Sequence, residues 1–159
     1  MCVDIDSVAF PQVREEAAYM EFTQYSYPSR AAFAQAGLGF LLREMVDFMQ
    51  QNINGNTNPK FLLFSGHDSS IMPLLTAFDM WNGQWTPYAA QLTWELYNVK
   101  ASASAPSTYG VRLLYDGRAW PVRGCTLTVG ELCDWNSFLS LVAPLMPSND
   151  PSACQRQPV

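Results

Sequence analysis

The segment Phe61-Leu62-Leu63-Phe64-Ser65-Gly66-His67-Asp68-Ser69-Ser70-Ile71 changes from apolar to polar at its centre. Its first four residues are too few for a helix and apolar on both faces, which is typical of a buried parallel strand. Apolar residues then recur at helical spacing from Ile71 to Phe78, with Pro73 tolerable only near the first turn of a helix. The segment therefore predicts a strand, a polar turn and a helix. In open α/β sheets such a turn lies at the carboxyl end of a strand, where ligands bind.

Upstream, the clearest pattern is another amphipathic helix. Apolar residues recur at helical spacing over residues 38–49 while charged residues fall on the opposite side, so this helix should face the core. The Asn-rich stretch 52–59 ends it as a polar loop. Nearer the start, two prolines bracket a short helix over residues 13–20, and the Tyr-Ser-Tyr-Pro-Ser stretch at 25–29 is predicted to be a loop.

Downstream, the period changes to that of a strand. Alternating apolar and polar residues over 90–97 predict a strand with one buried and one wetter face. Residues 101–108 are a Ser/Ala/Pro linker, and residues 111–115 are a second strand followed by Asp116-Gly117, a favoured two-residue hairpin turn. A last helix is predicted around 129–142, before several prolines stop regular structure. The predicted fold class is therefore α/β, with an antiparallel portion added to the parallel strand in a mixed sheet.

Composition excludes several classes of function. Hydrophobic residues make up 48% of the 159 residues and charged residues 14%, so the chain is expected to bury a core. The formal net charge is -5, and no basic run could neutralise a phosphate backbone, which argues against nucleic acid as a partner. No stretch approaches the roughly 18 apolar residues of a membrane-spanning helix. The opening residues, which include Asp4 and Asp6, show no targeting signal.

The four cysteines, Cys2, Cys125, Cys133 and Cys154, are more typical of disulfides or free thiols than of a metal site. They show no C-x-x-C spacing, and the chain has one histidine, so a zinc cluster is not expected. Their even number allows full pairing, and composition alone leaves disulfides and free buried thiols equally open.

His67 and Asp68 are the sharpest candidates for chemistry, because the only histidine stands beside a carboxylate in the predicted strand-to-helix turn. A helix beginning near Ser69 would offer unpaired N–H groups and the positive end of its dipole to a bound phosphate. A protonated His67 could hydrogen-bond that anion, and Asp68 could act as a general acid if a neighbouring phosphate keeps it protonated. The alternative is structural: Asp68 caps the helix and His67 is an ordinary satisfied polar residue.

Other kinds of site fit the sequence less well. Adjacent residues cannot orient one another as a serine triad does, and no G-x-S-x-G elbow is present, so a serine hydrolase is not expected. The run Asp4-Ile5-Asp6-Ser7-Val8 resembles the nucleophile loop of haloacid-dehalogenase-type phosphatases, in which Asp4 and Asp6 would act with magnesium. That loop should follow a buried strand, so a surface acidic turn is the preferred interpretation. Glu95, on the wetter face of its strand, suits a ligand contact or, more commonly, a cross-strand or capping role.

Longer motifs connect these residues to a known family. The runs Phe64-Ser65-Gly66-His67-Asp68-Ser69-Ser70-Ile71, Pro87-Tyr88-Ala89-Ala90 and Glu95-Leu96-Tyr97 resemble, in order, the second half of the histidine acid phosphatases, branch 2 of the histidine phosphatase superfamily. The family's corresponding runs read Tyr-Ser-Ala-His-Asp-Thr-Thr, Pro-Tyr-Ala-Ser and Glu-Leu-Tyr. The likeness covers roughly residues 37–155 and includes the stretches 39–45 and 111–115, Gly124-Cys125, Cys133 and Cys154-Gln155.

The resemblance implies hydrolysis of phosphomonoesters at acid pH through a phosphohistidine, with no metal and no other cofactor. Asp68 would protonate the leaving oxygen, and His67 would help to bind the phosphate. The implied fold is an α/β domain with a mixed sheet plus a smaller, mainly helical part. Residues 1–36 are assigned to that smaller part, and residues 37–159 to the C-terminal portion of the α/β domain.

The family's nucleophile has no counterpart in this chain. It is the histidine of an Arg-His-Gly motif near the family's N-terminus, whereas His67 is the only histidine here. The 159-residue chain alone is therefore predicted to be inactive, either as part of an acid phosphatase or as a degenerate paralogue that binds phosphate or a partner. The full-length protein would be secreted, lysosomal or in the endomembrane lumen, and a homodimer is compatible with the family. By the same resemblance Cys125 pairs with Cys133, and Gly66 replaces an alanine.

Overall fold

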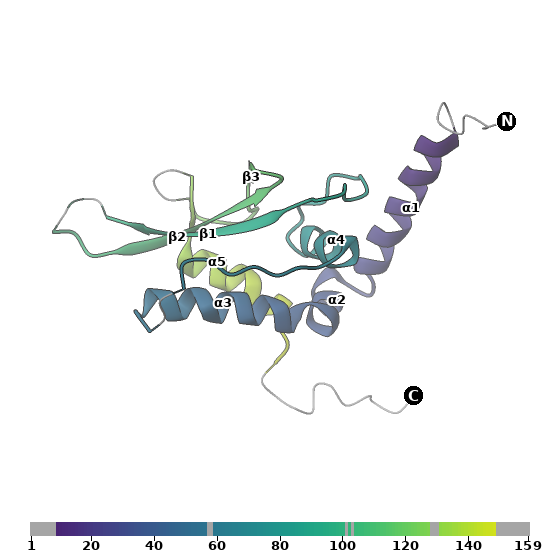
Figure 1. Ribbon diagram of the computed structural model, residues 1–159. Coiled ribbons are helices and arrows are strands. Elements are labelled where there is room, and N and C mark those ends of the chain that lie inside the picture. Colours follow the sequence, from purple (N-terminus) through teal and green to yellow (C-terminus); the bar gives the residue numbers. More distant parts are fainter. Residues whose placement is uncertain (1–8, 57–58, 101, 103, 128–130, 149–159) are drawn as a thin grey trace.

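A computed structural model describes residues 9–56, 59–100, 102, 104–127 and 131–148 of the chain (Figure 1). Within these residues, an antiparallel sheet packs on a layer of helices. Helices α3 (Gly39–Ile53) and α5 (Trp135–Val142) lie along one face of the sheet. Among the helices described, none combines the length and the apolar character that crossing a membrane requires.

The first part of the described chain is helical. Helix α1 spans Ala9–Tyr25 and α2 spans Arg30–Gly37. Helix α1 extends beyond the helix predicted over 13–20 at both ends. It can include Pro11 because this residue falls in its first turn, where a missing N–H leaves no intrahelical bond unmade. Helix α2 was not predicted. Its sequence signal is Ser29, whose side chain caps the helix by accepting the Ala32 N–H at 3.1 Å.

Both predicted amphipathic helices are confirmed. Helix α3 buries Leu42, Val46 and Met49, as the periodicity over 38–49 predicts. Helix α4 spans Asp68–Ala77 and holds Pro73 inside it, in the second turn rather than the first. The missing N–H of Pro73 removes only the bond to the carbonyl four residues earlier, so α4 continues through it.

The sheet is arranged around β2 (Thr108–Tyr115), which pairs with β1 (Leu92–Val99), β3 (Arg118–Trp120) and β4 (Cys133–Asp134). All three pairings are antiparallel. The strands predicted over 90–97 and 111–115 are thereby confirmed. Between β2 and β3, Asp116 and Gly117 have φ values of 50° and 73°, the left-handed conformation at both positions that a two-residue hairpin turn requires.

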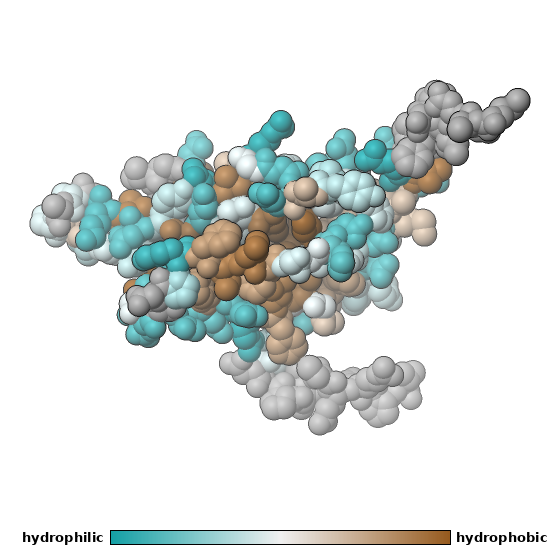
Figure 2. Space-filling model, viewed as in Figure 1, coloured by the Kyte–Doolittle hydropathy of each residue, from teal (hydrophilic) through white to brown (hydrophobic). Residues whose placement is uncertain are grey.

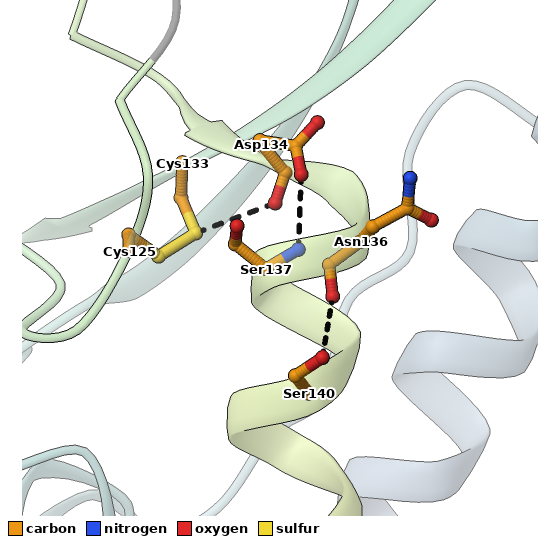
Figure 3. Close-up of a disulfide and its surroundings, with 6 residues drawn as sticks. All are labelled: Cys125, Cys133, Asp134, Asn136, Ser137 and Ser140. Atoms are coloured by element: carbon orange, nitrogen blue, oxygen red, sulfur yellow. Dashed lines mark hydrogen bonds between the residues drawn. A yellow bond between two sulfur atoms is a disulfide. The ribbon is translucent and has the colours of Figure 1, made fainter.

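The helix predicted over 129–142 begins later than expected, at Trp135. Asp134 fixes this start, because its carboxylate accepts the Ser137 N–H at 3.0 Å as an N-cap (Figure 3). The residues before it form β4, and residues 128–130 lie outside the described part. The predicted disulfide between Cys125 and Cys133 is present and ties the segment after β3 to β4 (Figure 3). Cys2 and Cys154 lie outside the described residues.

An aromatic cluster joins the helices to the sheet. Phe138 of α5, which is fully buried, meets the ring of Trp94 on β1 edge-on at 5.4 Å between centroids. It also stacks parallel to Phe78, the C-cap residue of α4, at 6.4 Å. Phe78 in turn meets Trp94 edge-on at 5.1 Å. The cluster therefore fixes the position of α4 relative to the sheet and to α5.

The strand predicted at 61–64 does not form, and this expectation is wrong for the described residues. The segment links α3 to α4 without helix or strand, and no strand of the described sheet pairs with it. Phe61 and Leu63 are 74% and 76% exposed. Figure 2 shows apolar side chains gathered on the face over this segment. An apolar run becomes a buried strand only when strands flank it, and the sheet described here supplies none.

We expect this exposed run to limit the solubility of the isolated chain. Replacing both Phe61 and Leu63 with serine should raise the soluble fraction and reduce binding of a hydrophobic dye, since both side chains face solvent and a contiguous apolar patch promotes association. The thermal midpoint should stay unchanged, because neither residue belongs to the buried core. Light scattering and dye fluorescence would measure the effect. Unaltered association of the double variant would show that another surface is responsible.

Candidate functional site

The candidate site is the turn that opens α4. His67 is the N-cap residue, with an extended backbone at φ -121° and ψ 176°. Its carbonyl accepts the N–H groups of Ser70 at 2.9 Å and Ile71 at 3.1 Å. Asp68 is the first helical residue, one position before the predicted start at Ser69. The turn therefore places the two candidate side chains side by side at the positive end of the α4 dipole.

Ser70 closes this turn from within the helix. Its hydroxyl oxygen accepts the N–H of His67 at 3.3 Å. A Cβ added at Gly66 would lie 2.8 Å from that oxygen, closer than such atoms approach. Glycine at position 66 therefore leaves room for the Ser70 side chain, and the pair holds the backbone that carries His67 and Asp68.

The Asp68 carboxylate accepts two hydrogen bonds. Oδ1 accepts the backbone N–H of Ser69 at 2.7 Å, and Oδ2 accepts the indole N–H of Trp85 at 3.0 Å. Both His67 and Asp68 are exposed, so a ligand can approach them from solvent. The cap position belongs to His67 and not to Asp68, which leaves the Asp68 carboxylate at the surface of the turn.

Helix α1 contributes Glu21 and Tyr25 to the same region. Burial raises the pKa of Tyr25, and its hydrogen bond with Glu21, the Glu21 charge and the Asp68 charge raise it further. The Tyr25 hydroxyl is thus neutral and lies within the electrostatic influence of Asp68. Phe22 stacks on Trp81 with 4.7 Å between ring centroids, which attaches α1 to the loop that follows α4.

Sequence reasoning did not find Trp85 or Tyr25. Neither belongs to a motif, and Trp85 lies 17 residues from Asp68 along the chain. The dehalogenase-type candidates Asp4 and Asp6 lie outside the described residues. In the part of the chain that the structure covers, His, Cys, Asp and Glu side chains do not gather in groups of three or more that could hold a metal ion.

Glu95 makes a cross-strand contact. Its carboxylate accepts a hydrogen bond from Arg112 Nε at 2.7 Å and one from the Tyr97 hydroxyl at 2.9 Å. The Arg112 guanidinium also lies 5.1 Å from the centre of the Tyr97 ring. Burial raises the pKa of Glu95, but the hydrogen bonds from Arg112 and Tyr97 and the Arg112 charge outweigh it and lower the pKa overall. Of the roles considered for Glu95, the structure shows the cross-strand contact.

Comparison with known proteins places the chain in a family. A family model described as Histidine phosphatase superfamily (branch 2) matches residues 12–116, well over half of the chain. The chain belongs to this family. The match begins upstream of residue 37, where the sequence motifs become recognisable, so α2, all but the first three residues of α1 and the His67–Asp68 turn fall within the region that matches the histidine phosphatase family.

The curated relatives include several acid phosphatases and one protein named as a counting factor. Counting factor 60 of Dictyostelium discoideum is 29% identical over 140 residues, which is 87% of this chain and 31% of that protein. Human lysosomal acid phosphatase is 32% identical over 99 residues, 61% of this chain and 22% of the relative. Bovine prostatic acid phosphatase is 27% identical over 116 residues, which is 73% of this chain and 29% of that protein. The chain therefore spans less than a third of the length of these relatives.

Proposed function

We propose that this chain carries the proton-donating side of an acid phosphatase site. In the whole protein a phosphomonoester would be cleaved through a phosphohistidine, with Asp68 protonating the leaving oxygen and His67 helping to bind the phosphate. The observation that carries the proposal is the exposed His67–Asp68 pair at the start of α4, inside the region that matches the histidine phosphatases.

The chemistry suits that turn. An incoming phosphate meets the positive end of the helix dipole, and a protonated His67 adds a charge-assisted hydrogen bond. The leaving oxygen of an alkyl ester develops negative charge as its bond to phosphorus breaks, so a neighbouring carboxylic acid that gives up its proton stabilises the transition state. Asp68 is exposed on the same turn as His67, which allows one substrate to contact both.

A second candidate is a non-catalytic chain that binds phosphate or a partner protein. It is favoured by one observation: His67 is the only histidine among the 159 residues. A phosphohistidine mechanism requires a separate histidine as nucleophile, which these 159 residues do not contain.

The assay that tests the proposal is hydrolysis of an aryl phosphate at acid pH by the purified 159-residue chain and by a longer product that includes an Arg-His-Gly segment. We expect no turnover by the chain alone and chelator-resistant turnover by the longer product. If the longer product binds phosphate but does not hydrolyse the ester, the second candidate is favoured. Turnover by the chain alone that depends on Asp68 would demand a different nucleophile and overturn this account.

The setting of the protein is also a proposal. We place the full-length protein in a secreted, lysosomal or endomembrane-lumen compartment, because the Cys125–Cys133 disulfide suits an oxidising environment. Relatives named as lysosomal and venom acid phosphatases support the same placement. We assign residues 1–36 to the smaller helical part of the family fold and residues 37–159 to its α/β domain.

A further inference from the structure

The side chain that contacts the Asp68 carboxylate is the indole of Trp85. Its N–H donates to Oδ2 at 3.0 Å, a normal length for a bond of this kind. Trp85 is half-buried in the loop between α4 and β1, whereas Asp68 is exposed. A half-buried ring therefore donates a hydrogen bond to an exposed carboxylate.

The loop that carries Trp85 is shaped by its own contacts. The N–H of Gln84 donates to the side-chain oxygen of Asn82 at 3.1 Å, and Gly83 has a φ of 81°, which a residue with a side chain rarely adopts. Trp81, earlier in this loop, stacks on Phe22, and in the part of the chain that the structure describes its buried indole nitrogen has no hydrogen-bond partner. The two tryptophans thus differ: Trp81 packs against α1, and Trp85 hydrogen-bonds Asp68.

Two contacts at opposite oxygens fix the orientation of a carboxyl group. The Ser69 N–H contacts Oδ1 and the Trp85 N–H contacts Oδ2. Each carboxylate oxygen has two lone pairs, so each oxygen keeps a position at which a proton can sit. Without the indole, Oδ2 would lose its protein partner, and the exposed side chain could populate its other staggered rotamers.

We propose that Trp85 is a positioning residue that holds the Asp68 carboxyl in one orientation. Its consequence for catalysis rests on the proposed function of Asp68, but the orientation itself does not. The substitution Trp85→Phe removes the N–H donor and keeps an aromatic ring in the loop. Trp81→Phe is the matched control, since it alters a tryptophan in the same loop whose N–H has no partner among the described residues.

The first test is the side-chain rotamer of Asp68, measured by NMR three-bond couplings to its Cγ in the 159-residue chain. Wild type and Trp81→Phe should each give couplings of one dominant rotamer, and Trp85→Phe should give averaged couplings. In addition, the indole N–H resonance of Trp85 should move upfield in Asp68→Ala, while the other indole resonances stay in place. Unaveraged couplings in Trp85→Phe, or an unmoved Trp85 resonance, would overturn the proposal.

The second test is kinetic and uses a form of the protein that hydrolyses phosphomonoesters. Trp85→Phe should lower kcat for an alkyl phosphate about tenfold, as the loss of one hydrogen bond to the carboxylate that forms in the transition state would, with KM and the turnover of an activated aryl ester nearly unchanged. If Trp85→Phe frees the Asp68 rotamer but Asp68→Asn has no kinetic effect, the proposed function fails and the orientation stands. If Asp68→Asn is slow but Trp85→Phe keeps wild-type turnover, the positioning role is wrong.

Discussion

Replacing Asp68 with asparagine should lower kcat for an alkyl phosphate by about 10²- to 10⁴-fold in any form of the protein that hydrolyses phosphomonoesters. An alkoxide is a poor leaving group, and the amide of asparagine has no acidic proton to give it. The substitution keeps the shape of the side chain, and its single oxygen can accept one of the two N–H groups, that of Ser69 or that of Trp85. The loss therefore reports on proton donation more than on structure. Steady-state kinetics with an alkyl and a nitrophenyl phosphate would measure it.

The comparison of the two esters separates proton donation from phosphate binding. A nitrophenolate leaves without help, so its kcat should fall far less in Asp68→Asn than that of the alkyl ester. Asp47→Asn is the matched control, because it removes the same charge from an exposed position on α3. Equal losses with the two esters, or an Asp68→Asn enzyme as active as Asp47→Asn on the alkyl ester, would show that Asp68 is not the proton donor.

Features of the fold that depend on neighbours along the chain could be predicted from the sequence. The helix over 38–49, the strands over 90–97 and 111–115 and the turn at Asp116-Gly117 each follow from a local pattern of apolar residues or from turn chemistry. The predicted Cys125–Cys133 disulfide is also present, and it came from the resemblance to the family rather than from spacing.

Features that depend on residues far away along the chain could not be predicted from the sequence. The apolar run at 61–64 has the composition of a central strand, yet a strand forms only where backbone groups of neighbouring strands are available. Composition cannot reveal whether those neighbours are present. Helix α2 was not predicted because half of its eight residues are Ala and the rest show little amphipathic pattern, so the cap at Ser29 is its main sequence signal.

In the candidate site, too, local features could be predicted from the sequence and long-range contacts could not. His67 and Asp68 were found because they stand in one short turn and because the chain has one histidine. Trp85 and Tyr25 come from the loop after α4 and from α1, and only folding brings their polar groups near Asp68. A motif therefore identified the residues proposed to react, while the residues that surround them required the structure.

The second large effect should come from the core that holds α4 in place. We expect Phe138→Ala to lower the free energy of unfolding by about 3–5 kcal/mol, through lost apolar burial and the cavity that remains. Phe138 has no exposed surface and contacts the rings of Phe78, Trp94 and Trp135. Because domains are stable by only about 5–15 kcal/mol, this substitution should bring the chain close to unfolding at ordinary temperatures. Urea denaturation followed by tryptophan fluorescence would measure the loss.

The control for this prediction is Phe40→Ala, which removes the same side chain from a position on α3 that is 62% exposed. Its effect should stay within about 0.5 kcal/mol. If the two variants lost similar stability, the aromatic cluster would not be the core that the contacts indicate. A large loss of unfolding free energy in Phe138→Ala alone, together with a weakened Trp85–Asp68 hydrogen bond, would show that packing of the core affects the candidate site. Phe138 stacks on Phe78, the C-cap residue of α4. Packing at the C-terminal end of α4 would then affect the turn at its N-terminal end, which carries His67 and Asp68.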